Sequence, residues 1–217
     1  MVLLAIWNRR NNLIHHRPCL LVGGLVPWCK AFLSNFLKAN AAVPPPIPNR
    51  FVRWIPPIQN VYKLNTDATL DDKKNITGLG AIMRDSSGAV MFSCIDSIVG
   101  LLALKVAETK AILFGLSAAI EGGITSMIIE YDCAPVIKML NDGSEPLSEI
   151  GVIISDIQGT LRYCNSSVKF SYVYRNGNLV AQSLAKLAII KNKVLVWVED
   201  VPLSTGSLVE TDSSFIL

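Results

Sequence analysis

The chain has 217 residues, of which 51% are apolar and 17% charged, so it can bury the core of one domain with appended segments. No apolar run reaches the roughly 18 to 20 residues that span a bilayer, which argues against a membrane protein. The net charge of +3 comes from residues 1–60, which carry seven Lys or Arg and no acidic residue. Such a segment is typical either of a nucleic-acid-binding arm or of a solvated stretch.

The five cysteines are odd in number, and no two of them form a Cys-x-x-Cys pair. This argues against a zinc site or a disulfide framework and predicts reduced thiols in an intracellular protein, in the nucleus or the cytoplasm. A signal peptide over the apolar stretch from Cys19 to Trp28 is the competing interpretation. The basic region before it is too long for one, and Lys30 interrupts the segment.

Four segments follow from composition along the chain. Residues 1–43 form a basic N-terminal segment, and the pattern of residues 1–12 predicts a short amphipathic helix. Residues 44–60 hold six of the eleven prolines, which favours an extended linker. Residues 61–190 are the predicted folded domain, and residues 191–217 are a predicted C-terminal tail.

The folded domain is expected to begin with three antiparallel strands. Residues 61–69 alternate between apolar and polar side chains, which predicts a strand that carries Asp67 near its end. A polar loop over residues 71–75 leads to a second strand that starts at Gly78. The turn residues from Asp85 to Gly88 then lead to a returning strand over residues 89–98. An Asp late in a strand is also a common turn-former or surface residue, and that alternative stays open.

Residues 103–121 predict a helix, with an inward stripe of apolar and small residues at spacings of three and four. The stripe comprises Leu104, Glu108, Ala111, Ile112, Gly115 and Ala119. A carboxylate in such a stripe is costly without a partner or a role. The alternative for Glu108 is a solvated position at the rim, near Lys105.

The second half of the domain predicts alternating strands and helices. A strand over residues 125–132 ends at Asp132 and passes into a helix that runs to about Leu140. For Asp132, helix capping and metal binding are competing roles. A helix over residues 147–164, a strand over 167–174 and a helix over 177–191 complete an α/β domain with a mixed sheet and flanking helices.

Carboxylates are the groups that can carry chemistry in this domain. Both histidines, His15 and His16, precede the linker, which excludes a Ser–His or Cys–His nucleophile inside the domain. Asp67, Glu108 and Asp132 fall toward one region of the predicted sheet. Clustered acids repel one another and are stable around hard cations such as Mg²⁺. A pair of such ions suits in-line hydrolysis of phosphodiesters.

Five ordered segments form a set across residues 61–190: Leu64-Asn-Thr-Asp67-Ala, Gly78-Leu-Gly80-Ala-Ile-Met-Arg-Asp85-Ser-Ser-Gly88, Ala107-Glu108-Thr-Lys-Ala111, Ile129-Glu-Tyr-Asp132 and Tyr174-Arg-Asn-Gly-Asn178-Leu-Val-Ala181-Gln-Ser-Leu-Ala-Lys186. This set resembles the ribonuclease H domain of plant non-LTR retrotransposon reverse transcriptases and their domesticated relatives. Residues 5–12 and 196–202 resemble the stretches that flank this domain in such elements, so the N-terminus resembles the remnant of a longer polyprotein.

The resemblance implies a ribonuclease H-like fold, with a five-stranded mixed sheet of three antiparallel and then two parallel strands. It implies that Asp67, Glu108 and Asp132 bind two Mg²⁺ or Mn²⁺ ions. The fourth catalytic position of the family is an Asp, and Gln182 stands there in this chain.

The resemblance also implies an RNA–DNA hybrid as the partner; the short apolar runs argue against a membrane, and the sequence indicates no obligate protein partner. The hybrid would be bound by shape rather than sequence, near Gly78, Gly80, Arg175 and Asn178. For the two glycines, flexibility at the start of a strand is the alternative interpretation.

Three departures from the family pattern bear on turnover. Gln182 removes a negative charge, so a second metal ion is expected to bind more weakly. Arg175 lies in the loop where many ribonucleases H have a His, and residues 141–149 are acidic where the family has a basic substrate handle. Three hypotheses therefore remain: a metal-dependent hybrid ribonuclease, a degenerate domain that binds nucleic acid without hydrolysis, and a structural or interaction module.

Overall fold

The computed structural model describes residues 2–31 except 17, 19, 20, 25 and 28, and residues 53–142, 148–163 and 167–214. The chain divides into two compact units, Met1–Arg50 and Phe51–Leu217. In the first unit, helix α1 spans Val2–Ile14, which confirms the expected N-terminal helix. Residues 44–52 of the expected proline-rich linker lie outside the described residues. Among the helices described, none is long and apolar enough to cross a membrane.

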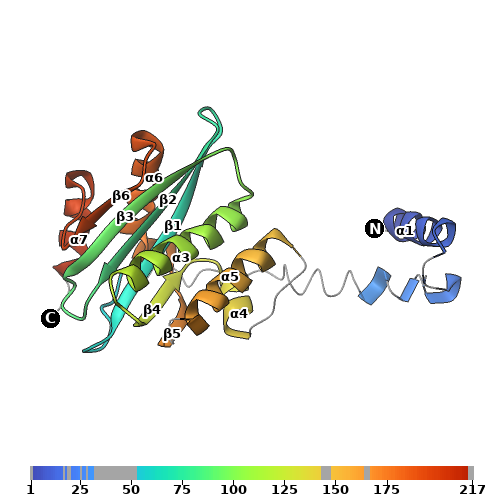
Figure 1. Cartoon of the computed structure of the whole chain (residues 1–217), viewed down its shortest axis with the longest axis horizontal. Helices are drawn as coiled ribbons and strands as arrows, with labels where there is room; N and C mark the ends of the chain where they lie inside the picture. The colour runs from blue at the N-terminus through green and yellow to red at the C-terminus, as the bar shows by residue number, and fades with distance from the viewer. Residues whose placement is uncertain are drawn as a thin grey trace. The chain divides into compact units, whose positions relative to one another are not determined.

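Six strands of the described residues form one mixed sheet in the second unit, in the order β5-β4-β1-β2-β3-β6 (Figure 1). Their bounds are β1 Tyr62–Asp71, β2 Ile76–Arg84, β3 Val90–Val99, β4 Ser126–Tyr131, β5 Ser167–Tyr172 and β6 Leu195–Val198. The pairs β1–β2 and β2–β3 are antiparallel. The pairs β1–β4 and β4–β5 are parallel. The expected mixed order of strands is therefore confirmed.

The sheet has a sixth strand where five were expected. Strand β6 pairs antiparallel with β3 and is followed by helix α7, Leu203–Ser213. The side chains of β6 alternate, because Leu195 and Trp197 pack against the buried core while Val196 and Val198 are exposed. This period of two, in a run of only four residues, is the signature of an edge strand with one buried face.

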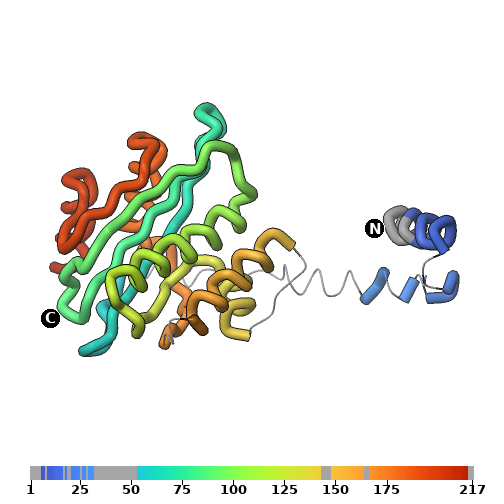
Figure 2. The backbone as a smooth tube through the Cα atoms, in the orientation of Figure 1, coloured from blue at the N-terminus to red at the C-terminus, as the bar shows by residue number. Residues whose placement is uncertain are grey.

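Helices cover both faces of the sheet. Helices α3 (Leu104–Glu121), α4 (Ala134–Asp142) and α5 (Glu149–Tyr163) share one large apolar cluster with side chains of the central strands. Helices α6 (Leu179–Lys191) and α7 pack on the opposite face, against Ile82 and Ile95. Figure 2 shows these layers, with the green and orange helices on one side of the sheet and the red helices on the other.

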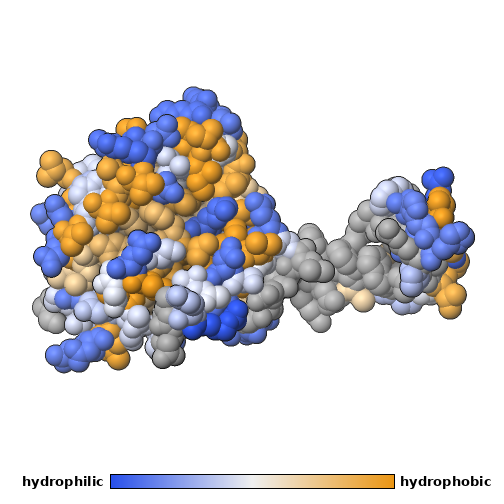
Figure 3. Space-filling model, in the orientation of Figure 1, coloured by the Kyte–Doolittle hydropathy of each residue, from blue (hydrophilic) through white to orange (hydrophobic). Residues whose placement is uncertain are grey.

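The expected stripe of α3 is confirmed except at its first residue. Ala111, Ile112, Gly115 and Ala119 are buried, whereas Leu104 is 51% exposed. Leu104 begins the helix, one turn before the helix meets the sheet. Apolar side chains also lie among charged ones on the face of the second unit seen in Figure 3, in keeping with the low charge content of the chain.

Helix α6 lies unusually close to β2 because two glycines face it. A Cβ atom at Gly80 would lie 2.4 Å from the backbone nitrogen of Ala185, and one at Gly78 would lie 2.3 Å from the Ala185 carbonyl oxygen. Any larger residue at these positions would push the helix away from the sheet. The two glycines therefore set the position of α6 relative to β1.

A buried polar network lies under strands β1, β2 and β4. The Arg84 guanidinium contacts Asp212 of α7 at 2.8 Å and stacks 3.6 Å from the ring centre of Trp54. The Trp54 indole donates to Asn65 Oδ1 at 2.9 Å, and Asn65 Nδ2 donates to Glu130 at 3.0 Å. The network thus joins the segment before β1 to the last helix.

Candidate functional site

Asp67 is the sixth of the ten residues of β1, in the middle of the strand rather than near its end as expected, and it lies on the strand face that also carries Asn65. The parallel register pairs Asn65 with Glu130 of β4, so two residues further along Asp67 comes beside Asp132. The Asp67 side chain is buried, with 7% of its surface exposed. Burial, followed by the charges of Asp132 and Glu108, raises the pKa of Asp67 to about 7. Asp67 is therefore not an ordinary surface aspartate.

Glu108 is half-buried in the second turn of α3 and has a specific partner. The hydroxyl of Tyr131, the last residue of β4, donates a hydrogen bond to Glu108 Oε2. Burial raises the pKa of Glu108, the Tyr131 hydrogen bond lowers it, and the charge of Asp132 raises it again, with a net rise. The structure thus favours a placed carboxylate over a solvated one at the rim.

Asp132 lies between the end of β4 and the start of α4. Helix α4 begins at Ala134, and the carbonyl oxygen of Cys133 accepts the hydrogen bonds of its first turn, from Val136 and Ile137, both at 3.1 Å. The N-cap position therefore falls on Cys133. Burial raises the pKa of Asp132, and the charge of Arg175 opposes that rise.

The charge of Arg175 acts on all three carboxylates. Arg175 begins a short 3₁₀ helix, Arg175–Gly177, between β5 and α6, and its side chain is exposed. Burial is the main cause of the raised pKa of each acid, and the Arg175 charge acts against it at Asp67, Glu108 and Asp132 alike. The loop that leads into α6 thus supplies positive charge to the cluster.

Asn178 fastens the start of α6 to β1. Its Nδ2 donates to the carbonyl oxygen of Thr66 at 2.9 Å, one residue before Asp67. The side chain is 2% exposed, and its Oδ1 has no hydrogen-bond partner among the described residues. Asn178 lies beneath the site surface, where it holds α6 against the strand that carries Asp67.

Gln182 lies in the first turn of α6, half-buried. Its Oε1 accepts a hydrogen bond from Lys186 Nζ at 3.5 Å. The charge of Lys186 also reaches Asp67, where it opposes the rise in pKa caused mainly by burial. A neutral amide therefore stands at the position that the resemblance assigns to a fourth acid, with the ammonium group of Lys186 bonded to it.

The other two residues expected near a substrate, Gly78 and Gly80, are buried beneath α6. Their contacts explain why they are glycines, since no Cβ atom fits below the helix. This reason differs from both interpretations of the sequence, substrate contact and flexibility at the start of a strand.

Two residues of the cluster were missed by the sequence reasoning. Tyr131 directly precedes Asp132, so on an alternating strand it points to the opposite face, toward α3, where Glu108 was expected. Lys186 lies four residues after Gln182, one helical turn away on the same face. Both spacings are present in the sequence, but only the folded structure shows which residue each side chain contacts.

The chemistry of the three carboxylates fits a hard divalent cation, because oxygen ligands suit Mg²⁺ and a cation would offset the burial, and at Asp67 and Glu108 also the acidic neighbours, that raise their pKa values. Their arrangement is less complete. Within residues 53–142, 148–163 and 167–214, no group of three His, Cys, Asp or Glu side chains is placed to hold a metal ion. Glu108 Oε2 is engaged by Tyr131, so Oε1 is the oxygen that remains for a ligand.

A hollow of about 410 Å³ lies beside the cluster, between the β1–β2 turn and α6. Its lining includes three lysines, Lys73, Lys74 and Lys186, together with the acids Asp71 and Asp72. Lys186 connects this hollow to Asp67 through its charge. Lys186 is therefore the basic side chain that the hollow shares with the surroundings of Asp67.

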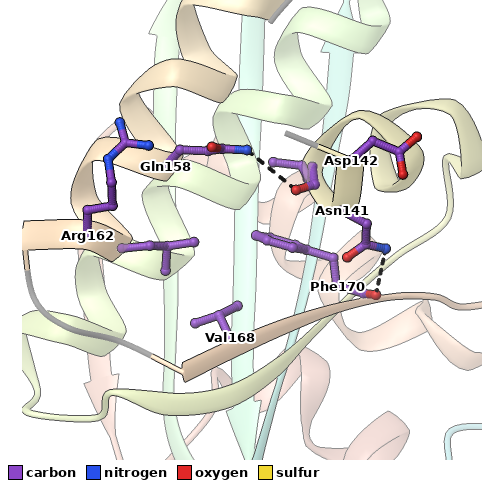
Figure 4. Close-up of a pocket in the computed structure, with 8 residues that line it drawn as sticks. Asn141, Asp142, Gln158, Arg162, Val168 and Phe170 are labelled. Atoms are coloured by element: carbon purple, nitrogen blue, oxygen red, sulfur yellow. Dashed lines mark hydrogen bonds between the residues drawn. The ribbon is translucent and has the colours of Figure 1, made fainter. Parts of the chain in front are cut away.

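A second hollow, also about 410 Å³, lies between α4, α5 and β5 (Figure 4). Its amides bridge the elements around it. Asn141 Nδ2 donates to the carbonyl oxygen of Phe170 at 3.3 Å, and Gln158 Nε2 donates to that of Leu140 at 3.5 Å. None of the three clustered carboxylates lines this hollow.

A family model described as reverse transcriptase-like matches residues 65–188. An Arabidopsis thaliana protein named as a ribonuclease H protein is 24% identical over 164 residues, which are 76% of this chain and 26% of that protein. The chain thus spans about a quarter of the length of this curated relative.

Two solved structures show the fold. The RNase H1 of the halophilic archaeon Halobacterium salinarum superposes with a TM-score of 0.55 at 19% identity, covering 61% of this chain and 99% of that one. LC11-RNase H1, solved in complex with an RNA/DNA hybrid, gives 0.54 at 17% identity, covering 60% and 97%. The second unit therefore has the ribonuclease H-like fold.

Proposed function

Since the chain belongs to the reverse transcriptase-like family, whose model matches residues 65–188, we propose that its second unit binds RNA–DNA hybrids and hydrolyses their RNA strand. The observation that carries this proposal is the buried Asp67, whose pKa is raised to about 7 by burial first and then by the charges of Asp132 and Glu108. A cluster of partly buried carboxylates costs stability, so it is expected where it has a ligand.

Asp67, Glu108 and Asp132 would hold the Mg²⁺ or Mn²⁺ ions, two when the site is active. When bound, such ions neutralise charge on the phosphodiester and activate a water for in-line attack. The chain prepares the carboxylates for this role. Tyr131 fixes Glu108 through its hydroxyl, and Asn178 anchors α6 to the backbone of β1 beside Asp67.

Substrate binding would rely on basic groups around the carboxylates. Arg175 is exposed and its charge acts on the cluster, and Lys73, Lys74 and Lys186 line the adjoining hollow. Contacts of this kind go to phosphates and fix the duplex without reading its sequence. We assign direct contact to Arg175 and the lysines. Asn178, Gly78 and Gly80 would act by positioning α6 and β1.

A second candidate function is binding without hydrolysis. Gln182 offers one neutral oxygen, and the ammonium group of Lys186 already donates to it. The site therefore has one negative charge fewer than a four-acid site, and the ammonium group of Lys186 lies against the neutral residue at the fourth position. Both features favour phosphate binding and disfavour a second metal ion.

The test is a cleavage assay on an RNA–DNA hybrid with Mg²⁺ and then Mn²⁺. It would compare the unmodified protein, Asp67→Asn, Gln182→Asp and the control Asp156→Asn, at an exposed aspartate of α5 that lines neither hollow. We expect metal-dependent cleavage by the unmodified protein, lost in Asp67→Asn and kept in Asp156→Asn. Gln182→Asp should lower the metal concentration for half-maximal rate by about tenfold or more, equivalent to ~1.4 kcal/mol.

Each outcome separates the two candidates. Cleavage only by Gln182→Asp, with hybrid binding by the unmodified protein, would favour binding without hydrolysis. Cleavage that survives Asp67→Asn would overturn the assignment of the site. If the unmodified protein neither cleaves nor binds a hybrid at low salt, both functions are wrong.

A further inference from the structure

Two exposed tyrosines stand together where β5 ends. Tyr172 and Tyr174 are 39% and 40% exposed, so part of each tyrosine is open to solvent. Their ring centres are 5.3 Å apart, and the ring planes meet at 80°. Val173 between them points inward and is 7% exposed. The strand therefore turns both rings outward as one pair.

The strand register places this pair beside the carboxylates. Tyr172 lies opposite Tyr131 in the β4–β5 pairing, and the backbone N–H of Val173 donates to the Tyr131 carbonyl oxygen at 3.1 Å. Tyr131 holds Glu108 and directly precedes Asp132. Burial and then the charge of Asp132 raise the pKa of Tyr172, in keeping with this closeness. The rings form one rim of the cluster.

The charged groups around the tyrosine pair indicate which kind of ligand the pair can bind. Arg175 follows Tyr174 directly and brings a cation to the same rim, next to acids that would repel a bare phosphate. An aromatic face with an adjacent guanidinium suits a nucleotide, because the base stacks on the ring while its phosphate meets the cation. Inside a duplex the base faces are stacked on one another, so a base within the duplex cannot reach such a ring, whereas an unpaired base can.

We propose that Tyr172 and Tyr174 stack an unpaired nucleobase at the rim of the carboxylate cluster, so that the site prefers hybrids with a single-stranded extension. This inference rests on the proposed function and narrows it. It names the substrate as a junction between hybrid and single strand, rather than an uninterrupted hybrid. Tyr172 and Tyr174 have no other assigned role in the site.

The experiment measures binding of the full chain by fluorescence anisotropy, without divalent metal so that nothing is cleaved. The probes are a blunt RNA–DNA hybrid, the same hybrid with an unpaired extension on each of its four strand ends in turn, and a single strand alone. The variants are Tyr172→Ala/Tyr174→Ala, Tyr172→Phe/Tyr174→Phe and Tyr163→Ala. Tyr163 is a matched control, because it is 93% exposed and lies at the end of α5, before β5 begins.

We expect at least one extension to tighten binding roughly tenfold over the blunt hybrid, the effect of stacking about one base. The double alanine variant should lose this gain while it binds the blunt hybrid as before. The double phenylalanine variant and Tyr163→Ala should keep the gain, since both keep the two rings at the rim. Circular dichroism checks that each variant is folded, and Tyr174→Ser alone replaces the double alanine variant if the latter is not.

The inference is overturned if no extension tightens binding, or if the gain persists without the rings. Its failure differs from failure of the proposed function, in which the blunt hybrid does not bind even at low salt. In that event, binding of the single strand alone tests the stacking site. Binding of the single strand that depends on the two rings supports the stacking site, and binding independent of them overturns it.

Discussion

Asp67 shows how much stability the metal-free protein loses by burying a carboxylate in this cluster. In the unfolded chain this group has the ordinary pKa of 3.8, and burial followed by its acidic neighbours raises the pKa to about 7 in the folded state. A group with a raised folded pKa stabilises the fold only while it is protonated. The contribution of Asp67 to the free energy of unfolding is therefore most favourable below about pH 4, and it is lost as the pH rises toward 7.

This cost can be measured by substitution. Asp67→Asn removes the titration, so in EDTA at pH 8 the variant should be more stable than the unmodified protein, by up to about 4 kcal/mol. Near pH 4 the two should be nearly equal. Urea unfolding at both values of pH tests this, with exposed Asp72→Asn as the control that should change neither. Parallel pH profiles for Asp67→Asn and the unmodified protein would contradict the raised pKa.

At the scale of elements, the contact between α6 and β2 determines the geometry of the site. Gly80 pairs with Asp67 across β1 and β2, and the backbone of α6 rests directly on Gly80. The first turn of α6 carries Gln182, and Asn178 ties that turn to Thr66. The position of the helix therefore decides how near Gln182 and Lys186 come to the carboxylates.

Gly80→Ala should separate these elements. Its Cβ atom would meet the backbone of Ala185 at 2.4 Å and of Ala181 at 2.7 Å, which a side-chain movement cannot relieve. We expect a loss of roughly 3 kcal/mol or more in the free energy of unfolding, together with weaker hybrid binding. The matched control is Gly159→Ala in α5, where nothing lies within 4 Å and a gain of about 0.5 to 1 kcal/mol is expected. Equal effects of the two changes would contradict the close packing of α6.

At the scale of the whole molecule, the second unit reaches beyond the segment that resembles the family. Trp54 lies before the first strand and is 3% exposed, and Asp212 lies in the last helix. Both contact Arg84, which is 1% exposed, across 128 residues of sequence in the case of Asp212. A buried guanidinium without these partners would be costly. We infer that the folding unit needs residues outside 61–190.

Two shortened chains test this boundary. A chain of residues 51–217 should unfold at the same urea concentration as the full chain, because it keeps the whole second unit. A chain of residues 61–217 should be less stable by about 3 to 5 kcal/mol, since it lacks the buried Trp54 ring. Trp54→Ala in the full chain should reproduce most of that loss. Equal midpoints for the two shortened chains would show that Trp54 contributes nothing.

The sequence by itself determined the order of the central strands and the main helices, because these follow from periods of two and of three to four residues among near neighbours. Alternation in β1 was enough to place Asp67 on one face, and the stripe of α3 to place Glu108 toward the sheet. Strand β6 was not predicted, because a run of four residues is too short for its alternation to be distinguished from an irregular C-terminal segment.

Only the tertiary structure decided which side chains meet. Tyr131 bonds Glu108 across 23 residues, and Asn178 bonds the backbone of Thr66 across 112. Strand register and helix position likewise decide that the charge of Arg175 acts on three acids. They also decide that α6 packs on Gly78 and Gly80. No local pattern encodes these contacts, because each is fixed by how separate elements pack together and not by either element alone.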